Sequence, residues 1–167
     1  MKKLLFWFMV LVTMTVVGCR PDSEEEDPLP STEESSSNVL EQYNAVGEFM
    51  VAKGTSGEYG ETDTMRLEIL DGGKANIVLN QVRFNEYMPV KTTLVLADLT
   101  VNYHNSQYTI NATSIVPLFN GAPYTQYTVN DLDFAYDVSA KVMNYTCLFC
   151  GTRGDMTVEY EGKTIDY

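Results

Sequence analysis

The stretch MRLEILDGGKANIVLNQV (residues 65–82) decides the fold of this 167-residue chain. Apolar and polar residues alternate on both sides of Asp71-Gly72-Gly73. Alternation with a period of two is typical of a half-buried strand. An Asp-Gly pair readily adopts the positive φ that a tight hairpin needs. We therefore predict that the two flanking segments form an antiparallel β-hairpin.

The same pattern recurs on both sides of this hairpin, from residue 39 to the end of the chain. Short runs of β-branched and aromatic residues are separated by Gly, Pro, Asn and Asp, whereas a helical period of 3.6 is not evident. The pattern predicts an all-β domain over residues 39–167. We expect strands at residues 46–53, 64–70, 74–84, 90–101, 107–116, 126–137, 140–150 and 156–165.

Eight antiparallel strands suit either a closed up-and-down barrel or a β-sandwich. Short connections between successive strands favour the barrel, because closure removes the edge strands. A barrel of this size is either filled by its own side chains or holds one small ligand. The residues that we expect to face inward are Phe49, Leu67, Ile69, Leu132, Phe134, Tyr136 and Tyr145.

Three short segments resemble the calycin-like β-barrel domain found in lipoproteins of gut-dwelling Gram-negative bacteria. They are Gly47-Glu48-Phe49, the strand that runs from Ile77-Val78-Leu79 to Phe84, and Phe149-Cys150-Gly151. The resemblance extends over roughly residues 43–165 and implies an eight-stranded, lipocalin-related barrel. Phe49 stands where lipocalins carry the Trp of their Gly-x-Trp motif. The family shares no common activity, so the resemblance implies a fold rather than a ligand.

Residues 1–18 are predicted to be a lipoprotein signal peptide. A basic start precedes an apolar run over residues 4–17, which ends in Val16-Val17-Gly18-Cys19. As a helix this run rises only about 21 Å, less than the ~30 Å hydrocarbon core of a membrane. The tetrapeptide resembles the bacterial lipobox, which implies cleavage before Cys19 and lipidation of its thiol. The alternative is an ordinary signal peptide followed by an incidental cysteine.

Residues 19–38 are predicted to be the lipidated cysteine and a disordered tether. The segment is rich in acids, Pro and Ser, so it buries too little apolar surface to fold. The acidic run at residues 22–27 resembles an export signal for the outer face of the outer membrane, and a plain solvated spacer is the alternative. We expect a protein that is anchored to the outer membrane by lipid on Cys19 and faces either the periplasm or the cell surface.

The charge and the residue types argue against two classes of function. Asp and Glu number 23 against 11 Lys and Arg, which disfavours nucleic acid as a partner because phosphates are bound by clustered basic residues. His104 is the only histidine and lies in a turn-like Tyr103-His104-Asn105-Ser106, and no Gly-x-Ser-x-Gly motif is present. We therefore expect no enzyme activity, no catalytic residues and no cofactor.

Two further motifs have more than one interpretation. In Cys147-Leu148-Phe149-Cys150 the two thiols point to opposite faces if the segment is extended. They are then either reduced cysteines or a disulfide that closes a turn at Gly151. The acids Asp131, Asp133 and Asp137 share one face of a strand, and we expect a solvated surface there and no metal site.

The candidate binding residues lie in loops. Leu118, Phe119 and Tyr124 make an unusually apolar loop, and Tyr87 and Met88 lie in another connection that we place at the same end of the barrel. Aromatic side chains at a barrel mouth bind ligands or partners, unless the loop folds back as a plug. Thr64, in Asp63-Thr64-Met65, matches a short O-glycosylation sequon.

These observations favour a binding or interaction lipoprotein. It would bind a small apolar molecule or a carbohydrate at the barrel mouth. Alternatively, its partner would be a glycan or an outer-membrane protein. The alternative is a structural accessory subunit of an outer-membrane complex, with a filled barrel and no ligand.

Overall fold

The computed structural model describes residues 38–53, 58–151 and 154–166. The predicted signal peptide, Cys19 and the tether up to residue 37 lie outside these residues. The described part of the chain is all-β, as predicted, and its one helical segment is a 3-10 turn, η1 (Asp71–Gly73). Within it, no helix is both long and apolar enough to span a membrane.

The described residues form eleven strands, so the predicted number of eight was wrong. Eight long strands overlap the predicted ranges: β1 (Val39–Ala52), β2 (Glu58–Leu70), β3 (Lys74–Val82), β4 (Thr92–Thr100), β6 (Gln107–Ile115), β9 (Tyr127–Asp137), β10 (Val142–Gly151) and β11 (Met156–Ile165). Three short ones are additional: β5 (Asn102–His104), β7 (Leu118–Phe119) and β8 (Ala122–Pro123). Two or three residues show no alternation of their own, which is why the sequence did not reveal these strands.

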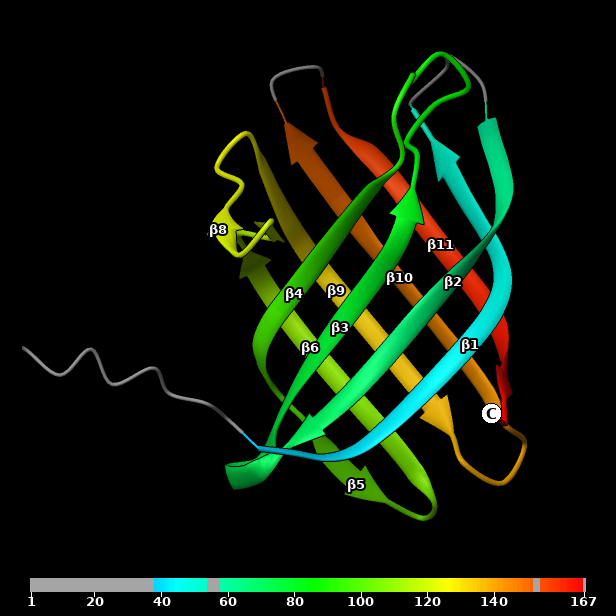
Figure 1. Ribbon diagram of the computed structural model, residues 1–167, viewed down its shortest axis with the longest axis vertical. Helices are drawn as coiled ribbons and strands as arrows, with labels where there is room; N and C mark the ends of the chain where they lie inside the picture. The colour runs from blue at the N-terminus through cyan, green and yellow to red at the C-terminus, as the bar shows by residue number, and fades with distance from the viewer. Residues whose placement is uncertain (1–37, 54–57, 152–153, 167) are drawn as a thin grey trace, which may run out of the picture. The chain divides into compact units, whose positions relative to one another are not determined.

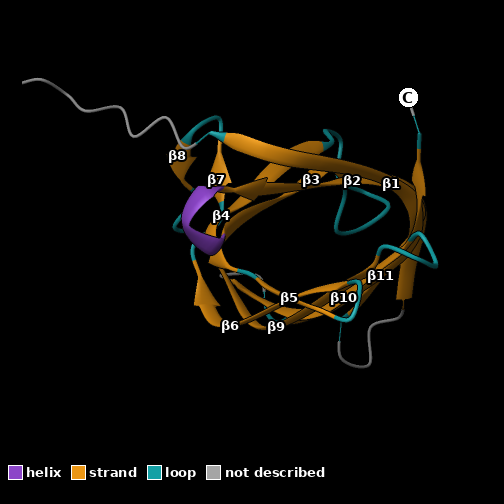
Figure 2. Cartoon of the chain, turned by 90° about the horizontal axis from the view of Figure 1, so that it is seen from below, coloured by secondary structure: helices purple, strands orange, loops and turns teal. Residues whose placement is uncertain are grey.

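All the strands belong to one antiparallel sheet, in the order β5-β6-β9-β10-β11-β1-β2-β3-β4-β7-β8. The sheet curls into a half-barrel (Figures 1 and 2). We call the end with the connection 83–91 the upper end. The lower end carries η1 and the turns between β5 and β6 and between β9 and β10 (Figure 1). Single-sheet topology rules out the sandwich alternative for the described residues.

The predicted hairpin is confirmed. β2 pairs with β3 from Thr64↔Asn80 to Leu70↔Lys74, and η1 connects the two strands. Gly72 and Gly73 have φ values of 66° and 72°. Glycine adopts this left-handed conformation without the steric penalty that a Cβ would cause.

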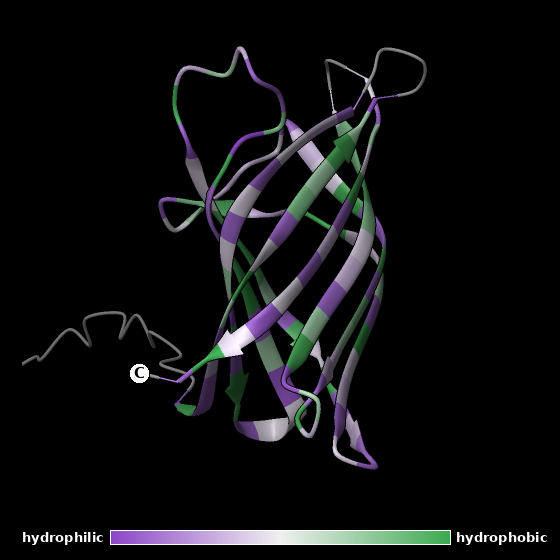
Figure 3. Cartoon of the chain, turned by 90° about the vertical axis from the view of Figure 1, so that its right-hand side faces the viewer, coloured by the Kyte–Doolittle hydropathy of each residue, from purple (hydrophilic) through white to green (hydrophobic). Residues whose placement is uncertain are grey.

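The hydrophobic core lies on the inner face of the curved sheet. Hydrophobic and hydrophilic residues alternate along the strands (Figure 3), and all seven residues predicted to face inward are buried. On β11, Met156, Val158 and Tyr160 are buried while the residues between them are exposed. The alternation predicted from the sequence is therefore confirmed.

Gly47 allows β1 and β11 to approach closely. It pairs with Gly162 of β11 and Asp63 of β2. A Cβ on Gly47 would overlap the backbone of Glu161 and Gly162. Because β1 and β11 are the first and last long strands, this contact joins the two ends of the domain's chain.

Candidate functional site

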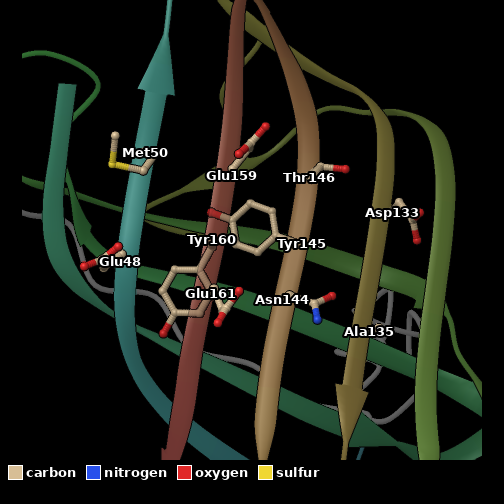
Figure 4. A pocket seen from close by; sticks show the side chains of 10 residues that line it. All are labelled: Glu48, Met50, Asp133, Ala135, Asn144, Tyr145, Thr146, Glu159, Tyr160 and Glu161. Atoms are coloured by element: carbon tan, nitrogen blue, oxygen red, sulfur yellow. The ribbon is translucent and has the colours of Figure 1, made fainter. Parts of the chain in front are cut away.

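A hollow of about 500 Å³ lies on the outer face of β1, β9, β10 and β11 (Figure 4). Its lining comprises Glu48, Met50, Asp133, Ala135, Asn144, Tyr145, Thr146, Glu159, Tyr160 and Glu161. It has four carboxylates and no basic side chain. The described residues contain no group of three or more His, Cys, Asp or Glu that could hold a metal ion. This hollow is therefore an acidic surface.

A second group of polar side chains lies on the inner face, toward the upper end. We call it the upper polar cluster, and its members are Tyr59, Glu61, Asp63, Arg83, Lys91, Tyr145 and Tyr160. Asp63 is only 5% exposed and is the one buried polar or charged residue among those described. A charged side chain is rarely buried unless it is paired. The upper polar cluster is therefore a local departure from an otherwise apolar core.

The alternation of β2 places the acids of this cluster. Tyr59, Glu61 and Asp63 precede Met65 and Leu67 at intervals of two residues, so all five share the inner face. The two basic residues flank the connection between β3 and β4, which brings both of them to the acids of β2.

Four ion-pair contacts join the acids and bases. Arg83 Nη2 lies 2.6 Å from Glu61 Oε2, and Lys91 Nζ lies 3.3 Å from the same oxygen. Lys91 Nζ also donates a hydrogen bond to Asp63 Oδ1 at 3.2 Å. Arg83 Nε donates to Glu61 Oε2 as well, at 3.2 Å, and the guanidinium carbon lies 5.9 Å from the ring centre of Tyr59. Two negative and two positive charges thus balance within the cluster.

The pKa values of the two carboxyl groups are shifted in opposite directions. Burial raises the pKa of Asp63 to about 6, even though Lys91 opposes this shift. Burial also acts to raise the pKa of Glu61, but hydrogen bonds led by that from Arg83 outweigh it and lower the pKa to about 2. Asp63 therefore loses its proton less readily than Glu61.

Five buried side-chain atoms of this cluster have no hydrogen-bond partner among the described residues. They are Tyr59 OH, Glu61 Oε1, Asp63 Oδ2, Tyr145 OH and Tyr160 OH. The rings of Tyr145 and Tyr160 stack with their centres 5.6 Å apart. The hydroxyl of Tyr160 lies next to Gly162. Gly162 pairs with Gly47 of β1, which in turn pairs with Asp63 of β2. Buried polar atoms are normally paired, so these five call for an explanation.

An aromatic row connects the surface to the core beside this cluster. Phe119 is 38% exposed and its ring centre lies 5.6 Å from that of Tyr124. The row continues through Tyr127, at 5.3 Å, to Phe84, at 6.2 Å. Phe84 then lies 4.8 Å from the fully buried Phe149. The contacts of the exposed loop therefore extend to the centre of the core.

The structure brings together three of the five predicted binding residues. Leu118 pairs with Val95 of β4, and the backbone N–H of Tyr124 donates to the carbonyl oxygen of Pro117 at 2.7 Å, which closes the β7–β8 hairpin around Phe119. Met88 is half-buried and packs against the core.

Tyr87 does not join this group. It is 85% exposed, and none of the aromatic pairs among the described residues includes it. In Figure 1 the connection 83–91 projects above the strands, whereas β8 lies below it at one edge of the sheet. The backbone N–H of Tyr87 donates to Asn85 Oδ1, so a local turn directs this segment.

Cys147 and Cys150 are free, and they face opposite sides of β10. Cys147 is buried on the inner face, where burial raises the pKa of its thiol to about 12. The Sγ of Cys150, on the outer side, accepts a hydrogen bond from Asn130 at 3.2 Å. A thiol that is buried and protonated is a poor nucleophile.

The remaining candidates lie at the surface. His104 is exposed at the end of β5, and Asp131 and Asp133 are exposed on β9. Thr64 is exposed on the outer face of β2, next to the inward-facing Asp63. None of these residues belongs to the upper polar cluster.

Most of this cluster is not predicted from the sequence. The second strand is predicted to begin at residue 64, so Asp63 enters the prediction only as part of a sequon. Extending the alternation of Met65 and Leu67 backwards would have placed both Asp63 and Glu61 on the buried face. No sequence pattern indicated that Arg83 and Lys91 would contact them.

Comparisons with known proteins do not assign the chain to a family. No protein-family model matches it, and no curated protein or solved structure does so either.

Proposed function

We propose that this chain is a membrane-anchored binding lipoprotein that acts outside the cytoplasm and binds a small ligand at the upper end of its β domain. In this proposal the lipid on Cys19 anchors the protein to the outer membrane, and the acidic tether separates the domain from the membrane surface. The predicted signal peptide and lipobox at residues 1–19 support this location. The protein has no enzyme activity in this proposal.

The observation that carries the binding role is the aromatic row beside the upper polar cluster. Ligand sites typically combine apolar and aromatic surface with a few polar groups in fixed positions. Here Phe119 supplies exposed aromatic surface, and Phe84 occupies the chain position next to Arg83 of the cluster. Both parts of such a site therefore meet in one region of the domain.

The proposal assumes that the sheet closes into a lipocalin-related, calycin-like barrel. The long strands follow one another in chain order around the sheet, from β6 through β11 and β1 to β4. β4 and β6, the two long strands at the open sides, contact each other, and β7 pairs with β4 at Val95↔Leu118. These contacts are consistent with an up-and-down barrel.

One observation favours the alternative, a structural accessory subunit without a ligand. Large side chains, among them Phe134, Tyr145 and Phe149, are completely or almost completely buried on the inner face. The 500 Å³ hollow is lined mainly by residues of the outer face. A densely filled interior suits a domain whose role is contact with other proteins.

Mass spectrometry of the full chain, purified in mild detergent, tests the proposal. We expect a small molecule to co-purify with the wild type and to be lost from the double variant Phe119→Ala, Tyr124→Ala. A matched control is Tyr103→Ala, which removes an exposed tyrosine at the lower end and should leave the ligand bound. A folded wild type that carries no small molecule would favour the accessory role.

The same sample tests the anchor. We expect the N-terminal peptide to begin at Cys19 and to carry diacylglycerol on its sulfur. An exported chain with a free thiol at Cys19 would contradict the lipoprotein assignment.

A further inference from the structure

We infer that the upper polar cluster binds a neutral, hydroxyl-rich group, such as a sugar ring or a polyol. This inference rests on the proposed binding function and specifies the ligand's chemistry. It depends on the charge balance of the cluster, on its five unpaired atoms and on its access to solvent.

The charge balance excludes a charged ligand group. Glu61 and Asp63 are already paired with Arg83 and Lys91. An additional anion or cation would bring an unbalanced charge into a low-dielectric region, which is costly. A neutral group avoids this cost.

The unpaired atoms call for a group that both donates and accepts hydrogen bonds. Glu61 Oε1 and Asp63 Oδ2, as carboxylate oxygens, only accept. The hydroxyls of Tyr59, Tyr145 and Tyr160 donate and accept. Ligand hydroxyls match both kinds, because each donates one hydrogen bond and accepts others. An apolar ligand would leave all five atoms unpaired, which is unfavourable for buried polar groups.

Access to the cluster is through its basic residues. The side chains of Arg83 and Lys91 are 33% and 36% exposed, whereas that of Asp63 is 3% exposed. The ion pairs therefore extend from solvent to the buried carboxylate. In this inference a ligand hydroxyl displaces the ammonium group of Lys91 from Asp63 and so reaches the buried oxygens.

Aromatic rings border the same place. Phe49 is the cross-strand neighbour of both Glu61 and Tyr160, and its ring centre lies 6.0 Å from that of Phe84. The C–H faces of sugar rings pack against aromatic rings, whereas their hydroxyls point to the polar groups around the edge. The combination of rings, carboxylates and hydroxyls is therefore suited to a sugar.

Ligand-observed NMR on the full chain in detergent tests the inference with a fixed panel of probes. The neutral probes are glucose, galactose, mannose and myo-inositol, and the comparison probes are glucuronate, glucosamine and octanoate. We expect at least one neutral probe to bind and the comparison probes to bind at least tenfold more weakly. Asp63→Asn and Tyr160→Phe should each weaken binding about tenfold or more, since each alters a group that the ligand pairs.

The control variant is Tyr43→Phe, which removes a tyrosine hydroxyl at the lower end and should leave binding unchanged. If Asp63→Asn fails to fold, Tyr160→Phe still tests the inference. The hydroxyl that it removes has no partner within the described residues, so we expect this variant to fold. Absence of binding by every neutral probe to the folded wild type would overturn the inference.

The outcomes also separate this inference from the proposed function. Binding of octanoate or of a charged probe, unaffected by either variant of the cluster, would overturn the hydroxyl-rich ligand but leave a binding role. A molecule that co-purifies with the wild type but is still retained by both cluster variants would do the same.

Discussion

The two ends of the curved sheet use tyrosine and carboxylate side chains in different ways. At the lower end, Tyr43 and Tyr108 both donate to Glu41 Oε2, at 2.5 and 2.7 Å. These hydrogen bonds lower the pKa of Glu41. The rings of Tyr43 and Tyr108 pack with those of Tyr103 and Tyr136. We call these four tyrosines together with Glu41 the lower tyrosine cluster.

At the upper end, the tyrosine hydroxyls are unpaired although the rings also stack. Tyr145 and Tyr160 are more deeply buried than Tyr43, yet their hydroxyls have no partner among the described residues. Satisfied hydrogen bonds contribute to stability, whereas unsatisfied buried groups reduce it. The lower tyrosine cluster therefore contributes to the stability of the domain. The unpaired hydroxyls of the upper polar cluster reduce stability, as expected if this cluster is the binding site that we propose.

The largest expected effect comes from a change at Gly47, between these two clusters. In Gly47→Ala the new Cβ overlaps the backbone of Glu161 and Gly162, which cannot move aside as a flexible side chain would. We expect a loss of about 3 kcal/mol or more in the free energy of unfolding, at the upper limit for overpacked sites. Chemical denaturation followed by circular dichroism measures it.

Gly60→Ala is the matched control. Gly60 also lies in a strand, but the added methyl group would clash with the side chain of Met50 alone, which is partly exposed and flexible, and its backbone neighbour, the carbonyl oxygen of Phe49, lies at an ordinary contact distance. We expect a loss below about 1 kcal/mol, within the range of ordinary surface changes. Equal losses in both variants would show that β1 and β11 are not packed as closely as described.

An intermediate effect is expected from the ionisation of Asp63. Burial raises its pKa to about 6 from 3.8, so the folded state binds this proton more tightly than the unfolded state does. The contribution of Asp63 to stability is therefore greatest below pH 4 and is lost as the pH rises from about 4 through about 6. The slope approaches about 1.4 kcal/mol per pH unit between these values.

The difference between wild type and Asp63→Asn isolates this contribution. The opposite shift of Glu61, whose pKa is lowered to about 2, acts between about pH 2 and 4.5 and is present in both proteins. We expect the variant to gain stability relative to the wild type as the pH rises from 4 to 7. A difference that stays constant over this range would show that Asp63 is not buried next to the core.

The sequence predicts the fold better than the site, for a physical reason. The hairpin at Asp71-Gly72-Gly73 and the strand around Phe134 depend on local turn chemistry and on a period of two, which a single segment displays by itself. The contacts of Arg83 and Lys91 with Asp63 depend instead on how separate strands lie beside one another. The three short strands were missed for the same reason, because their pairing is decided by the tertiary structure and not by their own residues.

The predicted binding residues illustrate the same limit. Phe119 and Tyr124 lie within one short hairpin, so their contact follows from a local turn. Tyr87 was placed with them only because both connections were assigned to one barrel end. Within the described residues Tyr87 is instead exposed in a local turn of its own connection and forms no aromatic pair with them.

The smallest effect is also the most direct comparison of the two clusters. Tyr43→Phe removes a hydroxyl that donates to Glu41, and we expect it to cost about 0.5–1.5 kcal/mol, the net value of one hydrogen bond. Tyr160→Phe removes a buried hydroxyl without a protein partner, so we expect the protein without ligand to be unchanged or slightly more stable. Thermal unfolding of both variants in parallel measures the difference. If Tyr160→Phe is the more destabilising of the two, then the Tyr160 hydroxyl is hydrogen-bonded in the ligand-free protein, and the upper polar cluster does not differ from the lower tyrosine cluster in the way that the proposed binding role requires.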